Sequence, residues 1–238
     1  YIEFDTTAPV LTEDKIGGTT YSADATASWQ KNTTLGVEGS VTEEGSGVKV
    51  VYYQITTGAD EAEPVGTMTT TNYETAATGK IYTADNGTTE TFSSTLTGFE
   101  SGTNVLSYVI VDNLGNVSSV YERTIKPDAT TPTVKELATD DTDYVAFSKQ
   151  YFGKSAKGFT FRYLIYDADS GINTNSVDVT IGDYTISQTD PTYGTLTVAE
   201  QALTVTTTDG KITGIAKAAE GATDTVTGYL VTVELKNS

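Results

Sequence analysis

The amino-acid sequence predicts an all-β protein made of two tandem modules. Threonine is the commonest of its 238 residues, and strong helix formers such as Leu, Arg and Gln are scarce, which is a composition typical of β-sheets. Strand-like segments with alternating apolar side chains recur along the chain. A set of short motifs also occurs twice in the same order, at an offset of about 124 residues.

The clearest strand-and-turn unit runs from Asn104 to Asn116. Its first part has β-forming side chains on both faces, as in a central strand, and it ends in a polar turn where Gly115 can adopt a positive φ. A degenerate copy, Tyr229–Asn237, closes the chain. Period-two alternation predicts that the inward positions are Leu106, Tyr108 and Ile110 in the first copy and Val231, Val233 and Leu235 in the second.

Two matching segments, Asp5–Pro9 and Asp128–Pro132, open the two modules. Proline removes a ladder donor and keeps the preceding residue extended, which suits a linker that enters an edge strand. We therefore predict module one over residues 1–127 and module two over residues 128–238. Residues 1–4 have the character of the end of a preceding strand and module two stops before its last strand, so we expect the chain to be part of a longer protein.

Polar, glycine-rich turns separate the predicted strands of module one. Glu43–Gly47 is one such turn, and Asp85-Asn86-Gly87 is a strong signal for a tight hairpin. We expect residues 57–79 to form a long polar loop or a weak edge. Besides the strand that begins at Asn104, the predicted strands are Thr34–Val41, Val48–Ile55, Lys80–Ala84, Thr88–Leu96 and Val117–Ile125.

Module two repeats this order less completely. Its turn Asp167–Gly171 is in register with module one, because Ser170-Gly171-Ile172 corresponds to Ser46-Gly47-Val48. Asp209-Gly210 predicts a hairpin turn, and residues 216–222 are too few for a stable helix. Besides the strand that begins at Tyr229, the predicted strands are Phe159–Tyr166, Ser176–Ile181, Leu203–Thr208 and Lys211–Ile215.

Taken in order, these motifs resemble bacterial Ig-like repeats of large cell-surface proteins such as adhesins and S-layer proteins. The shared order is Asp-x-x-x-Pro, an aromatic residue, a strand, acidic-x-Ser-Gly-Val/Ile, a Tyr-bearing strand and Gly-x-Asn-strand-Asp-x-x-Gly-Asn. Module one carries all of it, and module two carries Asp128–Pro132, Asp167–Ile172 and Tyr229–Asn237. The resemblance implies two tandem Ig-like Greek-key β-sandwiches of about seven strands each.

Charge and composition limit which partners the chain can bind and indicate where it is located. A formal net charge of −18 makes nucleic acid and anionic membranes poor partners. The chain has no Cys and no His, so it forms no disulfide, and a thiol-free, acidic, Thr-rich chain favours an extracellular, cell-surface location. It also has no apolar run near the ~18 residues that span a bilayer.

The residue types available argue against an enzyme. Without His or Cys the chain cannot build a Ser-His-Asp triad, a thiol nucleophile or an ordinary zinc site. Paired carboxylates for glycoside hydrolysis would need a cleft, whereas most of the acids here fall in turns. We therefore expect no catalytic activity.

The acidic turns are instead candidate calcium sites, because Ca²⁺ is bound by carboxylate, amide and carbonyl oxygens. In the implied sandwiches the entry linker and two of the turns meet at one end of each module. Module one would gather Asp5, Glu43, Glu44, Asp112, Asn113 and Asn116. Asp128, Asp167 and Asp169 would gather atop module two, facing the turn that contains Glu100. The alternative is that all these residues are ordinary turn formers kept in water.

Two further interpretations concern the aromatic residues and the chain end. Strand tyrosines are either half-buried or a sugar-stacking platform; the residues in question are Tyr52, Tyr53, Tyr108, Tyr121, Tyr163 and Tyr166. Trp29 is expected to plug one end of module one. A module that lacks its last strand exposes a strand edge. We expect the missing strand either to lie in a continuation of the chain or to come from a neighbouring chain, with residues 1–4 as a candidate donor.

These observations favour a non-catalytic spacer or assembly segment of an extracellular bacterial surface protein, an adhesin stalk or an S-layer-type array. Its expected partners are neighbouring Ig-like modules of the same or adjacent chains, with a glycan or host-surface ligand left open. The rival hypothesis is a carbohydrate-binding or accessory module of a secreted glycoside hydrolase. Coplanar, exposed Trp29 and Tyr rings would favour the rival, and buried rings would favour the spacer.

Overall fold

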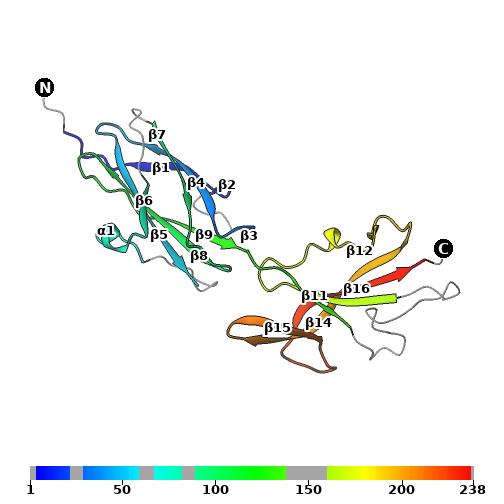
Figure 1. Ribbon diagram of the computed structural model, residues 1–238. Helices are drawn as coiled ribbons and strands as arrows, with labels where there is room; N and C mark the ends of the chain where they lie inside the picture. Colours follow the sequence, from blue (N-terminus) through cyan, green and yellow to red (C-terminus); the bar gives the residue numbers. More distant parts are fainter. Residues whose placement is uncertain (1–3, 22–28, 59–66, 82–88, 138–159, 237–238) are drawn as a thin grey trace. The chain divides into compact units, whose positions relative to one another are not determined.

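The computed structural model describes residues 4–21, 29–58, 67–81, 89–137 and 160–236 (Figure 1). The chain divides into two compact units, Tyr1–Ala129 and Thr130–Ser238, beside the boundary expected at residues 127 and 128. The described residues form several sheets, whose strand pairs are antiparallel apart from β3 with β9. Their helices are two short turns, α1 (Tyr73–Ala76) and η2 (Thr174–Ser176). The all-β class predicted from composition is confirmed.

The first sheet of unit 1 has the strand order β2-β1-β4-β7. Its strands are β2 (Thr19–Tyr21), β1 (Val10–Ile16), β4 (Leu35–Thr42) and β7 (Thr89–Leu96). Along β4 every second side chain is buried, including Leu35, Val37 and Val41. This period-two pattern turns one face of the sheet toward the core.

The second sheet of unit 1 has the order β3-β9-β8-β5-β6. Its strands are β3 (Trp29–Gln30), β9 (Tyr121–Pro127), β8 (Asn104–Asp112), β5 (Val48–Thr57) and β6 (Gly79–Ile81). All nine residues of β8 are buried. The prediction of a central strand covered on both faces is confirmed.

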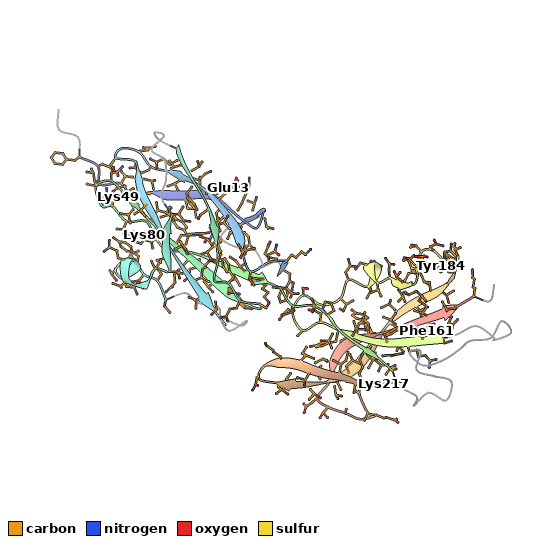
Figure 2. All side chains as sticks on the ribbon, in the orientation of Figure 1. Glu13, Lys49, Lys80, Phe161, Tyr184 and Lys217 are labelled. Atoms are coloured by element: carbon orange, nitrogen blue, oxygen red, sulfur yellow. The ribbon has the colours of Figure 1, made fainter. Side chains whose placement is uncertain are left out.

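Side chains from both sheets build the core of unit 1. Leu106, Tyr108 and Ile110 of β8 pack in one cluster with Val37 and Phe92 of the first sheet, so the inward positions predicted for module one are confirmed. The opposite face of the second sheet is covered by Met68 and by residues of α1. Figure 2 labels one exposed side chain from each sheet, Glu13 of β1 in the first sheet and Lys49 of β5 in the second.

One hairpin predicted in module one is wrong. β6 pairs with Val51–Tyr53 of β5, whereas β7 pairs along β4 in the other sheet. The connection therefore crosses from one sheet to the other instead of joining two partners. The Asp85–Gly87 turn itself lies outside the described residues.

Unit 2 contains one five-stranded sheet of order β10-β11-β16-β14-β15 and a small hairpin of β12 and β13. The five strands are β10 (Thr133–Glu136), β11 (Thr160–Tyr166), β16 (Val226–Leu235), β14 (Gly194–Thr208) and β15 (Lys211–Lys217). The edge strands β10 and β15 approach each other, so the sheet curls into a nearly closed, barrel-like form. Tandem Ig sandwiches are therefore not confirmed.

The hairpin β12 (Val179–Ile181) and β13 (Tyr184–Ile186) covers one face of this sheet. Val231 and Val233 of β16 are buried in the cluster beneath it, and Leu235 packs against that cluster. The inward direction of these three side chains is thus as predicted, although they face a two-stranded hairpin. On the other face of the sheet Leu164, Leu203 and Ile215 form a second cluster.

The last strand differs from its prediction. β16 lies in the middle of the sheet, paired with β11 on one side and β14 on the other. The exposed edge predicted for this strand is therefore wrong, and the argument for strand donation to unit 2 falls with it. The hairpin of β14 and β15 is confirmed: its turn holds Asp209 at φ 51° and Gly210 at φ 72°, the positive values that tight hairpin turns require.

Candidate metal site

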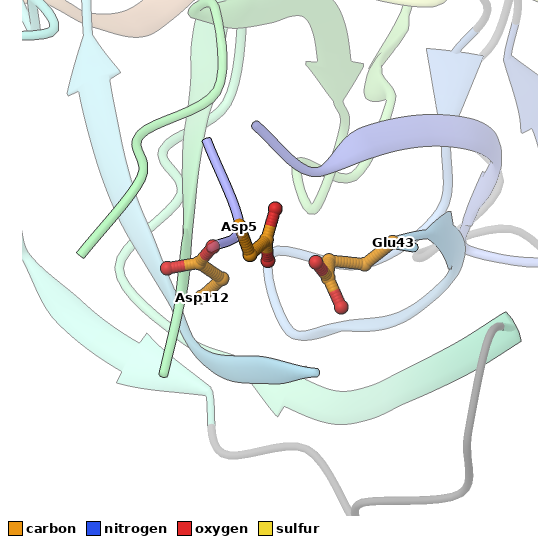
Figure 3. A group of neighbouring side chains, drawn as sticks. All are labelled: Asp5, Glu43 and Asp112. Atoms are coloured by element: carbon orange, nitrogen blue, oxygen red, sulfur yellow. The ribbon is translucent and has the colours of Figure 1, made fainter. Parts of the chain in front are cut away.

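Three carboxylates from distant parts of the sequence meet at one end of unit 1 (Figure 3). Asp5 precedes β1, Glu43 follows β4 and Asp112 ends β8. One oxygen atom from each lies within 4.8 Å of the others. The structure thus brings together three of the residues predicted for the module-one cluster.

Asp112 is fully buried and organises the turn that follows β8. Its Oδ1 accepts hydrogen bonds from the backbone N–H groups of Leu114 (2.9 Å) and Asn116 (2.7 Å), and its Oδ2 accepts one from Asn116 Nδ2 (2.7 Å). The Asn116 amide also donates to the backbone carbonyl of Asp5 (3.2 Å). Asn116 therefore ties the entry segment to the Asp112 turn.

Successive backbone amides of the Glu43–Gly47 turn and the first residue of β5 hold three carboxylates. The N–H of Ser46 donates to Asp5 Oδ2 (3.0 Å), that of Gly47 to Glu43 Oε2, and that of Val48 to Glu90 Oε1 (2.7 Å). Each of these backbone amides therefore holds one carboxylate by a charge-assisted hydrogen bond.

The turn needs glycine for the close approach of Asp5. A Cβ at Gly45 would lie 2.8 Å from Asp5 Oδ2, and the Gly45 φ of 151° is one that other residues rarely adopt. The Gly-Ser-Gly sequence therefore makes room for the Asp5 carboxylate.

The environment shifts the pKa values of two of these acids in opposite directions. The backbone N–H of Thr7 holds the pKa of Asp5 below its ordinary value. Burial raises the pKa of Glu43 above its ordinary value against the effect of the Gly47 N–H, and the nearby Asp5 adds to the rise.

The cluster retains acceptor capacity that the protein itself does not use. Glu43 is only 2% exposed, yet its Oε1 has no hydrogen-bond partner among the described residues. Buried carboxylate oxygens in proteins are normally paired or coordinate a metal. Hard oxygen donors with no nitrogen or sulfur ligand suit Ca²⁺ or Mg²⁺.

The two neighbouring residues predicted for this cluster make no comparable contribution. Glu44 is exposed. Asn113 is exposed as well, and its Nδ2 donates to the Ser46 carbonyl (2.8 Å). Asn113 therefore supports the turn from outside.

The residues predicted at the junction have turn roles within their own units. Glu100 is exposed, and its backbone N–H and carbonyl bond to the Asn104 side chain. Asp128 is buried in unit 1, and its N–H donates to the Gln30 carbonyl (2.6 Å).

In unit 2, Asp167 Oδ1 accepts from the N–H groups of Asp169 (3.0 Å) and Gly171 (3.2 Å). Asp169 Oδ2 accepts from Thr130 Oγ1 (3.1 Å). A shared junction site for these residues stays a prediction.

The aromatic platform considered as a sugar site does not form. Tyr52 and Tyr108 are buried, and the other four strand tyrosines named above are half-buried. Trp29 is 38% exposed, so it is not a buried plug. Lys126 Nζ lies 5.5 Å from the Trp29 ring centroid.

Two acids that carry local structure were missed in the sequence. Glu90 and Asp14 are almost fully buried on β7 and β1. The alternation Glu90, Phe92 within a predicted strand places the acid on the core face and is the signal that was available. Nothing in the sequence pairs Asp14 with its partner Arg123.

Comparisons with solved structures find distant likenesses. No family model and no curated protein matches the chain. Among solved structures it is similar to a segment of dimeric latent PorU from Porphyromonas gingivalis (TM-score 0.34, 9% identity, 99% of this chain and 17% of that one). It is also similar to a segment of Streptomyces avermitilis alpha-L-rhamnosidase in complex with L-rhamnose (TM-score 0.31, 10% identity, 97% and 22%).

The chain thus spans about a fifth of each of these proteins, and likenesses at these scores assign neither a family nor a function. Among the described residues, no helix has the length and apolar character needed to cross a membrane.

Proposed function

We propose that the chain is a non-catalytic structural segment of an extracellular surface protein, and that Ca²⁺ fastens the entry segment of unit 1. The observation that carries the proposal is the meeting of Asp5, Glu43 and Asp112 from three separate segments. A cation at this point would hold the N-terminal segment, the β4–β5 turn and the end of β8 together. Such a clamp would stiffen unit 1, which suits a structural segment that has no catalytic role.

The donor set favours Ca²⁺ over Mg²⁺. Ca²⁺ accepts irregular sets of about six to eight oxygens, whereas Mg²⁺ demands nearly ideal octahedral geometry. Here the carboxylates are already fixed by amides of three turns, so they have little freedom to adjust. Water would complete the coordination shell.

Calorimetry of the whole chain with Ca²⁺ or with EDTA tests the clamp. A ligand bound only by the folded state stabilises it by about 2.7 kcal/mol at a hundredfold excess over Kd, so the melting temperature of unit 1 should rise with Ca²⁺. Asp5→Asn keeps the size of the half-buried side chain and should remove most of the rise. Asp209→Asn, in the hairpin turn of unit 2, is the matched control. Equal melting temperatures with Ca²⁺ and EDTA would leave the three acids as turn formers.

A second candidate function, carbohydrate binding, is favoured by one pair of residues. Tyr184 and Tyr193 of unit 2 are 54% and 47% exposed, with ring centroids 4.7 Å apart and planes inclined at 54°. Exposed ring faces of this kind can stack on a sugar. A glycan array screened with wild type and Tyr184→Ala tests this candidate, and binding that the substitution leaves unchanged would exclude this pair.

A further inference from the structure

Unit 2 contains a cleft of about 560 Å³ between its main sheet and the segment Gly171–Thr180. The sheet contributes side chains of β10, β11 and β16 to the floor, and the segment that leads into the β12–β13 hairpin forms the opposite wall. The volume lies within the range of about 300–1,000 Å³ typical of ligand pockets.

Apolar side chains from both the floor and the wall line much of the cleft. Ile165 and Val231 are buried at the bottom, and Ile172 and Val177 of the wall are half-buried in the same cluster. Val134 also lines the cleft and is 62% exposed. An entering apolar group would therefore exchange water for contacts with aliphatic side chains on several sides.

The charge that lines the cleft is negative and belongs to Asp178. The polar side chains of Asn173 and Ser176 form hydrogen bonds within their own turn. Asn173 Oδ1 accepts from the Asn175 N–H (3.3 Å), and Ser176 Oγ donates to the Asn173 carbonyl (2.9 Å). Asp178 is exposed and is the one charged residue among the described residues that line the cleft. With a chain net charge of −18, the field at this site favours cations over anions.

We propose that the cleft binds a basic, apolar peptide segment of a partner protein. An aromatic or branched aliphatic side chain fills the space between the sheet and the wall, and a flanking Lys or Arg lies toward Asp178. Charge complementarity selects this occupant, since an acidic segment of equal hydrophobicity would be repelled.

Two small probes that share an indole ring but differ in charge can test whether charge affects binding to the cleft. Tryptophan amide is a cation and N-acetyltryptophan is an anion at neutral pH. Methyl NMR of the full chain at low salt should show saturable shifts at Val134, Ile172 and Val177 with tryptophan amide. Binding of N-acetyltryptophan should be about fivefold weaker or more, because opposite and like charges about 4 Å away differ by at least that factor in water.

Asp178→Asn should reduce the difference in affinity between the two probes without affecting folding, since the side chain is exposed. Asp183→Asn is the control: this acid is also exposed in unit 2 but does not line the cleft. Equal affinity for the two probes in wild type overturns the proposal. So does the absence of methyl shifts in the cleft at millimolar tryptophan amide.

Discussion

Arg123 of β9 forms a two-pronged ion pair with Asp14 of β1 and so joins the two sheets of unit 1. Arg123 Nε lies 3.0 Å from Asp14 Oδ2, and Nη2 lies 3.1 Å from Oδ1. The side chains are 10% and 1% exposed. The geometry matches the paired donors of a guanidinium to the two oxygens of a carboxylate.

Arg123→Met should destabilise unit 1 strongly, because it leaves the Asp14 carboxylate buried without a partner. The expected loss is about 3–5 kcal/mol, measured by urea unfolding. The double variant Asp14→Leu/Arg123→Met should recover most of that loss, since it removes both charges together. As a control, Glu13→Gln breaks the exposed pair with Lys15 and should cost less than about 1 kcal/mol. If Arg123→Met lowers the free energy of unfolding as little as the control does, the ion pair does not contribute to the stability of unit 1.

Titration of the Asp14 carboxylate should make the stability of unit 1 depend on pH. Burial raises the pKa of Asp14 above its ordinary value of 3.8, against the opposing effect of Arg123. A raised folded-state pKa means stability that is present below pH 3.8 and is lost as pH rises through the folded-state pKa. The stability of Asp14→Asn relative to wild type should therefore increase as pH rises from 3.8 to the folded-state pKa of Asp14, and should be level above it. A relative stability that falls over the same range would show that Arg123 outweighs burial.

The residues that could be predicted from sequence are those whose local motif sets their position. Asp5, Glu43 and Asp112 each sit in a polar turn next to a strand, and the resemblance to Ig-like repeats implied that these turns meet at one end of the first module. The partnership of Asp14 with Arg123 links two strands of different sheets, and no local pattern encodes it.

Two topological errors have the same origin. The Asp85–Gly87 motif is a local turn signal, and it says nothing about whether its flanking strands stay in one sheet. In unit 2 the strand β14 runs over fifteen residues, and its first half was missed because Glu200 and Gln201 interrupt the apolar alternation. The exposed edge of β16 was expected because an Ig-like module without its last strand leaves that edge open; instead, residues Gly194–Leu203 of β14 pair along it.

Gly39 of β4 should tolerate no side chain, whereas Gly36 on the same strand should. A Cβ at Gly39 would lie 2.3 Å from the ring of Phe92, its cross-strand partner, but a Cβ at Gly36 would meet nothing within 4 Å. Gly39→Ala should cost about 1–3 kcal/mol through overpacking. Gly36→Ala should be neutral or slightly stabilising. Comparable losses in chemical denaturation would mean that the Phe92 ring moves freely aside.

The last prediction separates the shape of the cation site from its charge. Gly45→Ala retains all three carboxylates but places a Cβ 2.8 Å from Asp5 Oδ2, at a φ of 151° that alanine rarely adopts. Asp5 should be displaced from the Ser46 N–H, and the Ca²⁺-dependent rise in melting temperature should shrink although the net charge is unchanged. Gly36→Ala should retain the full rise. If Gly45→Ala responds to Ca²⁺ as wild type does, the ion is held by the general negative field of the turns and not by Asp5 in the position described here.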